Sequence, residues 1–206
     1  YPALKKYFIE FGKDRLEQSG KPGSRKKTGN EWFETQDQIA YWKLFEEPKI
    51  VWGELSDQAK FTFDDSRHYV EATTFFLTGE SLKYLLGIFN SKVAQWYFEK
   101  ISTTSGMGTN RWKKYKIQQL PIPVPGSKEE KLLDQLVDRV LSVKMENGDS
   151  SKWENKIDAK IFHLYGLNEN EMVQVLETFK DLSIKDRNQI QNEYWNISNN
   201  KFKTEA

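Results

Sequence analysis

The chain contains no cysteine among its 206 residues, so it can form neither a disulfide framework nor a thiolate metal site. The lack of cysteine is typical of a reducing compartment, and we expect a cytoplasmic protein. No run approaches about 18 consecutive apolar residues, so neither a membrane span nor a membrane partner is predicted. Because the chain begins at Tyr1 rather than at a methionine, we expect a piece of a longer polypeptide.

Familiar catalytic motifs are also missing. Neither a Walker-type phosphate loop nor a Gly-x-Ser-x-Gly elbow is present. The acidic pair Asp64 and Asp65 could hold a metal ion for a nuclease, with Glu54 and Lys60 loosely nearby in the sequence, but adjacent carboxylates in a turn are usually solvated. We therefore expect no catalytic residue, metal site or cofactor in this chain, and neither methyl transfer nor cleavage by the chain alone.

Acidic residues are absent between Lys100 and Lys128, although the whole chain is almost neutral, with 31 basic and 30 acidic side chains. Within this window, a loop rich in Gly, Ser, Thr and Asn leads into four cations interleaved with Trp112 and Tyr115. Such a local basic patch is typical of a groove-binding surface, and a solvated surface loop is the alternative. The candidate DNA-binding residues of this segment are Ser105, Thr109, Asn110, Arg111, Lys113 and Lys114.

Residues 105–114 are predicted to be the main base-reading element. The planar fork of Arg111 suits a guanine edge, and the amide of Asn110 suits an adenine edge. Lys113 and Lys114 would bind the neighbouring phosphates, because a lysine ammonium is a compact point charge.

Two further segments could contact DNA. Residues 20–30 form a second acid-free loop whose cations are expected to bind phosphate, with a disordered insertion as the alternative. Residues 64–68 carry turn-forming side chains and are expected to connect a β-hairpin. The candidate DNA-binding residues of the two segments are Arg25, Lys26, Lys27, Arg67 and His68.

The hydrophobic pattern predicts an α+β fold, with a mixed β-sheet recognition domain followed by a helical C-terminal region. Strands are expected at Lys49–Trp52, Lys60–Phe63 and Tyr69–Leu77, and a helix in two pieces is expected over 80–98. Three alternating prolines and a glycine at 121–126 cannot continue a helix or a central strand. We therefore place the domain boundary there, giving domains 1–126 and 127–206.

The helical region is predicted to begin at a capping box formed by Ser127 and Glu130. Its first helix would present an apolar face from Leu132 to Leu141. Asn168 is expected to cap a later helix. The polar tail after about Asp186 is expected to be loosely held.

Several segments in chain order resemble the motifs of the TaqI-like C-terminal specificity domain. They are Pro48–Val51, Phe61–Asp64, Thr73–Leu77, Tyr84–Phe98, Ile117–Pro123 and Ile157–Leu167. Each motif is weak alone, but their shared order is specific, and the resemblance covers roughly residues 1–180. Phe89 stands where leucine is usual, which is a change in packing.

This resemblance implies a target-recognition domain of a type II restriction-modification enzyme that acts in bacterial defence. Its partners would be double-stranded DNA and a methyltransferase domain of the same parent chain, often accompanied by an endonuclease. The methyltransferase signature Asn-Pro-Pro-Tyr is absent from these residues. S-adenosylmethionine and Mg²⁺ would therefore belong to other domains of the parent.

Two other functions fit parts of the sequence. Trp112 and Tyr115 beside lysines could stack bases in an RNA- or single-strand-binding domain. The C-terminal helices could instead form a protein-interaction module, if the apolar face from Leu132 to Leu141 is exposed.

Overall fold

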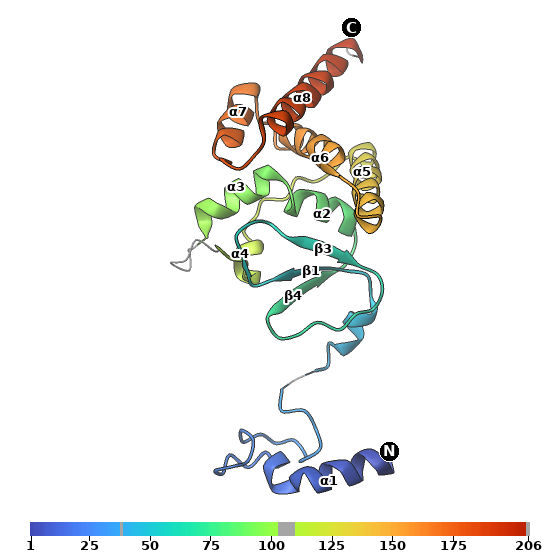
Figure 1. Ribbon diagram of the computed structural model, residues 1–206, viewed down its shortest axis with the longest axis vertical. Helices are drawn as coiled ribbons and strands as arrows, with labels where there is room; N and C mark the ends of the chain where they lie inside the picture. Colours follow the sequence, from blue (N-terminus) through green and yellow to red (C-terminus); the bar gives the residue numbers. More distant parts are fainter. Residues whose placement is uncertain (38, 103–109, 205–206) are drawn as a thin grey trace. The chain divides into compact units, whose positions relative to one another are not determined.

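The computed structural model describes residues 1–37, 39–102 and 110–204, with side chains as far as Asn199 (Figure 1). The chain divides into two compact units, Tyr1–Phe45 and Glu46–Ala206, which are described separately. A small antiparallel sheet is followed by a series of helices, so the α+β class and the helical C-terminal region are confirmed. Among the described residues, no helix is both long and apolar enough to cross a membrane.

The first unit contains helix α1 (Pro2–Leu16) and a loop held by polar contacts. A proline begins the helix, where its missing N–H costs nothing, and no side chain of α1 is buried. The side-chain amide of Gln18, which is buried, donates to the carbonyls of Glu31 and Glu34 at 3.1 Å each. Hydrogen bonds rather than a hydrophobic core therefore hold this loop. A short 3₁₀ helix, η1 (Trp42–Glu46), lies where the first unit ends and the second begins.

The second unit is built around strand β1 (Lys49–Gly53). Strands β3 (Phe61–Asp64) and β4 (Thr74–Thr78) pair with β1 on its two sides, and both run antiparallel to it. All described strand pairings are antiparallel, whereas we expected a mixed sheet. A second pairing joins β2 (Leu55–Ser56) to β5 (Asn110–Arg111).

The predicted hairpin between β3 and β4 is wrong. The strand order is β3-β1-β4, so β1 separates the two strands. Asp64 ends β3 opposite Lys49, whereas Thr74 begins β4 opposite Gly53, so residues 65–73 run the length of β1. Turn-forming residues predict where a strand ends, but they do not predict which strand it pairs with.

Helices α2 (Leu82–Phe89) and α3 (Lys92–Ile101) cover one side of the sheet (Figure 1). The expected break between them lies at Asn90 and Ser91, and the hydroxyl of Ser91 caps α3 by accepting from the N–H of Ala94 at 3.1 Å. The side chain of Asn90 bonds both backbone groups of Phe61, which ties α2 to β3.

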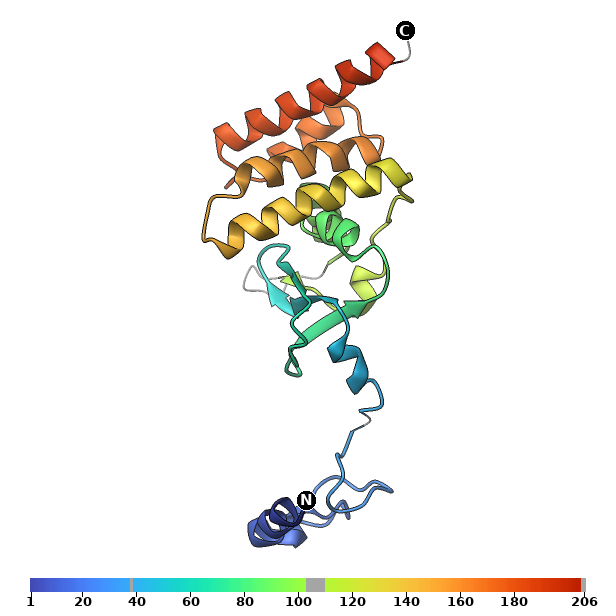
Figure 2. The same cartoon turned by 90° about the vertical axis from the view of Figure 1, so that its right-hand side faces the viewer.

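The C-terminal helices are stacked in layers above α2 (Figure 2). After the short α4 (Lys114–Ile117) and the prolines come α5 (Ser127–Met145), α6 (Ser151–Leu164), α7 (Glu169–Glu177) and α8 (Ile184–Thr204). Their buried side chains join those of the sheet in one continuous core, which runs from Ile50 to Tyr194. The domain boundary after Gly126 stays a prediction, since the structure locates the helices but not the part that contacts DNA.

Three predictions about the helix ends have different outcomes. The capping box at Asn168 is confirmed, with Glu171 as its partner. The capping box at Ser127 is wrong, because Gly126 is the N-cap of α5 and Glu130 accepts a hydrogen bond from Ser81 instead. The loose tail is also wrong for the first half of α8, where Ile190 and Tyr194 are buried.

Candidate nucleic-acid interface

The basic segment after residue 109 is anchored by Trp112. The residue is only 1% exposed, and its ring stacks on Phe98 with centroids 3.8 Å apart and planes 4° from parallel. Phe61 meets the same ring edge-on at 5.6 Å. The indole N–H donates to the carbonyl of Ser56 at 3.1 Å, so the polar atom of the side chain is also satisfied.

The backbone of Trp112 is held as firmly as its ring. Its N–H donates to the carbonyl of Glu54 at 2.7 Å, and its carbonyl accepts from the indole of Trp52 at 2.8 Å. Arg111 pairs with Leu55 in the β2–β5 ribbon. The chain at 111–113 is therefore fixed by hydrogen bonds to β1, to β2 and to the residue between them.

The residues on either side of Trp112 face outward. The side chain of Arg111 is 49% exposed and that of Lys113 is 38% exposed. Both approach one carboxylate oxygen of Glu54, with Arg111 Nη1 at 3.1 Å and Lys113 Nζ at 3.7 Å. The backbone at Lys113 is extended, like that of β5 (Asn110–Arg111), and in an extended chain successive side chains point to opposite sides. The buried tryptophan thus presents two cations on a rigid backbone.

The other described residues of this segment differ in exposure. Lys114 is exposed at the start of α4. Lys116 turns inward, and its ammonium donates to the carbonyl of Ile101 at 2.5 Å. Asn110 is only 7% exposed, so its amide does not lie on the surface where we expected it to read adenine. Ser105 and Thr109 lie outside the described residues.

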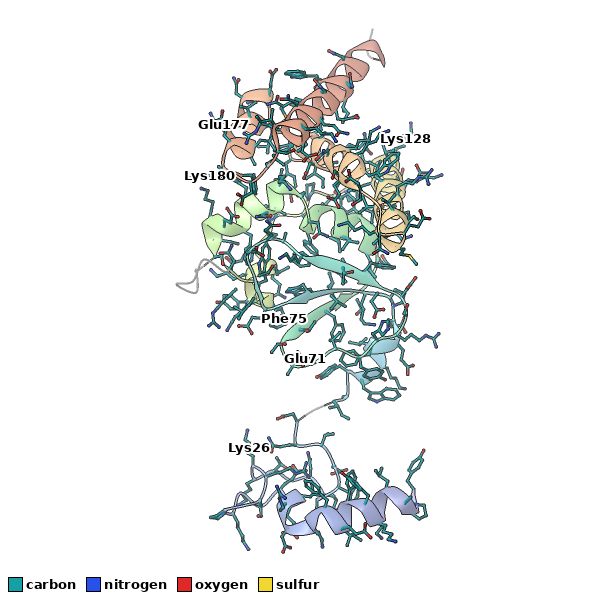
Figure 3. All side chains as sticks on the ribbon, viewed as in Figure 1. Lys26, Glu71, Phe75, Lys128, Glu177 and Lys180 are labelled. Atoms are coloured by element: carbon teal, nitrogen blue, oxygen red, sulfur yellow. The ribbon has the colours of Figure 1, made fainter. Side chains whose placement is uncertain are left out.

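The three predicted cations in the loop of the first unit have different surroundings. The guanidinium of Arg25 donates to the carbonyls of Leu16 and Trp32 at 2.7 Å and to that of Glu34 at 3.0 Å. Arg25 therefore organises the loop. Lys26 and Lys27 are exposed, and Figure 3 shows Lys26 projecting from the loop. Their contact with phosphate stays a prediction.

At the other end of β1, Asp64 organises the segment that carries Arg67 and His68. Its carboxylate lies 2.6 Å from Nζ of the fully buried Lys49 and 2.9 Å from Nδ1 of His68, and it also accepts the N–H of Ser66 at 3.0 Å. Burial would raise the pKa of Asp64, but the bonds from Lys49, His68 and Ser66 outweigh it and hold the pKa well below its usual range.

This arrangement argues against a nuclease centre at Asp64. The carboxylate is occupied by Lys49 and His68, and Glu54 lies beyond the opposite end of β1 rather than beside it. The distance along the strand is about 16 Å at the usual rise per residue. Within the described ranges, no group of three or more His, Cys, Asp or Glu side chains could hold a metal ion. Arg67 and His68 remain exposed on the surface.

Glu54 is the site residue that the sequence did not identify as a partner of the basic segment. It lies 57 positions before Arg111, and the two are brought together by the β2–β5 pairing and by the bond from the N–H of Trp112 to the carbonyl of Glu54. Nothing local linked it to an acid-free window so far along the chain.

Exposed cations held at the end of a small sheet are one feature of nucleic-acid-binding domains. The profile of the TaqI-like C-terminal specificity domain matches residues 3–122, and the chain belongs to this family. It is thus a DNA-recognition specificity domain of restriction-modification enzymes. The match ends before α5, so the likeness of Ile157–Leu167 to a family helix stays a resemblance.

Proposed function

We propose that this chain recognises a specific sequence in double-stranded DNA and directs a methyltransferase, a nuclease or both in its parent polypeptide. The observation that carries the proposal is the pair of outward cations, Arg111 and Lys113, on a backbone fixed by buried Trp112. Base discrimination needs donors held in a defined place, because a bidentate contact depends on geometry. A mobile basic loop would give affinity without discrimination.

In this proposal Arg111 reads a guanine edge, while Lys113 and Lys114 bind the phosphates beside it. Lys26 and Lys27 add phosphate contacts from the first unit. S-adenosylmethionine and Mg²⁺ act in other domains of a cytoplasmic parent enzyme, since the chain carries no Asn-Pro-Pro-Tyr signature. The described residues likewise offer no cluster of three metal-ligating side chains.

The two alternative functions lose support. Trp112 cannot stack on a base while its ring is buried against Phe98, which leaves only Tyr115 exposed for that role. Most of the apolar face of α5 packs within the protein, because Leu133 and Val137 are buried and Leu136, Val140 and Leu141 are partly buried, while Leu132 is exposed. A protein-interaction module on that face would lack its surface.

The proposal is tested by selecting binders from a randomised double-stranded DNA library with the purified chain and comparing the enriched profiles. Arg111→Ala is expected to lose preference at one position, by about 5- to 100-fold. Lys113→Ala is expected to weaken all sequences about equally and to make the dependence on salt shallower. An unchanged profile in Arg111→Ala would move the base-reading role to Arg67 and His68. Equal affinity for single-stranded DNA or RNA would favour the single-strand alternative.

A further inference from the structure

Glu54 is placed as firmly as the tryptophan that faces it. Its backbone N–H donates to the carbonyl of Thr73 at 3.0 Å, and its carbonyl accepts the N–H of Trp112 at 2.7 Å. Its side chain is 28% exposed. These two backbone bonds place the Glu54 side chain between the end of β1 and strand β5.

From this position the carboxylate constrains the guanidinium of Arg111. One oxygen lies 3.1 Å from Nη1, within hydrogen-bond range. A guanidinium is a planar group with five N–H donors, so one bond to Nη1 restricts its orientation and leaves the other donors available. Reading guanine uses two of those donors in a fixed direction. The bond to Glu54 therefore leaves enough donors on Arg111 for a base contact. It also limits the orientations of the guanidinium before DNA binds.

The same carboxylate also changes the local charge. It lies between Arg111 and Lys113, with the ammonium of Lys113 at 3.7 Å, so one negative charge offsets part of two positive ones. Phosphates occur at every nucleotide, whereas the matching base occurs only at the target. A fixed carboxylate beside Arg111 penalises a phosphate oxygen there but leaves the uncharged edge of guanine acceptable.

We propose that Glu54 is a positioning residue for DNA specificity: it orients Arg111 toward a base edge and keeps that side chain from binding phosphate. This inference rests on the proposed function, in which Arg111 reads a base. An ordinary surface ion pair would contribute little and would not alter sequence preference. The discriminating quantity is therefore the ratio of affinities for target and non-target DNA, rather than stability.

Two substitutions separate the two effects of Glu54. Glu54→Gln keeps an acceptor for Arg111 but removes the charge, so binding to non-target DNA should tighten several-fold. Glu54→Asp keeps the charge but withdraws the oxygen, so preference at the position read by Arg111 should fall about tenfold. Neither change touches the backbone bonds that Glu54 makes to Thr73 and Trp112.

Asp138→Asn is the matched control. It also removes one negative charge from an ion pair, because Asp138 on α5 lies 2.7 Å from the ammonium of Lys83 on α2. It should leave the affinity ratio unchanged.

The measurement uses the full chain and the randomised duplex library, followed by titration of the most enriched duplex and of a duplex absent from the enriched set. An unchanged ratio in both Glu54 variants, with Arg111→Ala still losing preference, would overturn this inference alone. If Arg111→Ala also keeps the wild-type profile, the proposed base-reading role fails instead. A ratio that shifts equally in Asp138→Asn would show a general charge effect and would also overturn the inference.

Discussion

At the scale of single residues, Asp64 and Asp158 each lie near a lysine, but their pKa values shift in opposite directions. Asp64 lies 2.6 Å from the ammonium of Lys49, which helps to hold its pKa low. Asp158 lies 4.0 Å from the ammonium of Lys92, and its side chain is 6% exposed. Burial raises the pKa of Asp158 to about 6, although Lys92 and its backbone N–H oppose the rise. The bonds at Asp64, which include one from the closer lysine, outweigh the effect of burial on its pKa, whereas the more distant lysine at Asp158 does not.

The raised pKa of Asp158 predicts how stability depends on pH. In the unfolded chain this carboxyl titrates near pH 4, so between about pH 4 and pH 6 the folded state binds more protons than the unfolded state. The contribution of Asp158 is therefore complete below pH 4 and is lost as pH rises through about 6. The side chain of the Asp158→Asn variant cannot ionise. The free energy of unfolding of the variant, relative to that of the wild type, should therefore be about 3 kcal/mol higher at pH 7 than at pH 4.

Urea unfolding of both proteins at pH 4, 5, 6 and 7 measures this difference. The asparagine can still accept the backbone N–H of Lys92, which the aspartate accepts at 2.7 Å. Parallel stability curves across the four pH values would contradict the prediction.

At the scale of elements, Gly87 lets α2 approach α5. A Cβ at this position would lie 3.3 Å from Cγ and Cδ2 of Leu133 and 3.3 Å from Cγ2 of Val137. Both neighbours are buried, so they have little room to move. The close contact joins the helix that covers the sheet to the first helix of the C-terminal region.

Gly87→Val should therefore destabilise the protein by about 2 kcal/mol, since its methyl groups overpack this contact. Chemical unfolding provides the measurement. Gly29→Val is the control, because a Cβ there meets nothing within 4 Å. Adding Leu133→Ala to Gly87→Val should recover part of the loss, and a purely additive double variant would show that crowding is not the cause.

Local features of the sequence predicted the positions of helices and strands well, but they predicted poorly which strands pair. The break between α2 and α3 and the cap at Asn168 depend on neighbouring residues, and both were predicted. The order β3-β1-β4 and the burial of Ile190 depend on distant residues, and both were missed. The candidate site divides in the same way. Arg111 and Lys113 stood out by composition, whereas Glu54 and the inward turn of Asn110 followed from the β2–β5 pairing.

At the scale of the whole molecule, the sheet and the C-terminal helices depend on each other. Residues buried on α2 and α3 share one core with residues of α5, α6 and α7. The hydroxyl of Tyr84 on α2 also donates to the carbonyl of Pro123 at 2.9 Å. The sheet and helices of the second unit therefore share the apolar surface that stabilises both.

Two truncations test this dependence. A chain of residues 46–206 keeps the second compact unit and should unfold cooperatively, as followed by circular dichroism during heating. A chain of residues 1–126 loses Leu133 and Val137, which lie against Gly87 of α2, and should show no cooperative transition. A sharp transition in the shorter chain would mean that the sheet and α2 form a sufficient core without the later helices.

The alternation around Trp112 also bears on how such proteins diverge. Trp112 is buried in the core, and it is flanked by two residues, Arg111 and Lys113, whose side chains contribute little to that core. Substitutions at Arg111 and Lys113 should therefore change the free energy of unfolding little, whereas the proposed function has Arg111 set the base preference and Lys113 the affinity for phosphate. In the proposed function, drift at Arg111 changes the preferred base while the scaffold around Trp112 is inherited unchanged.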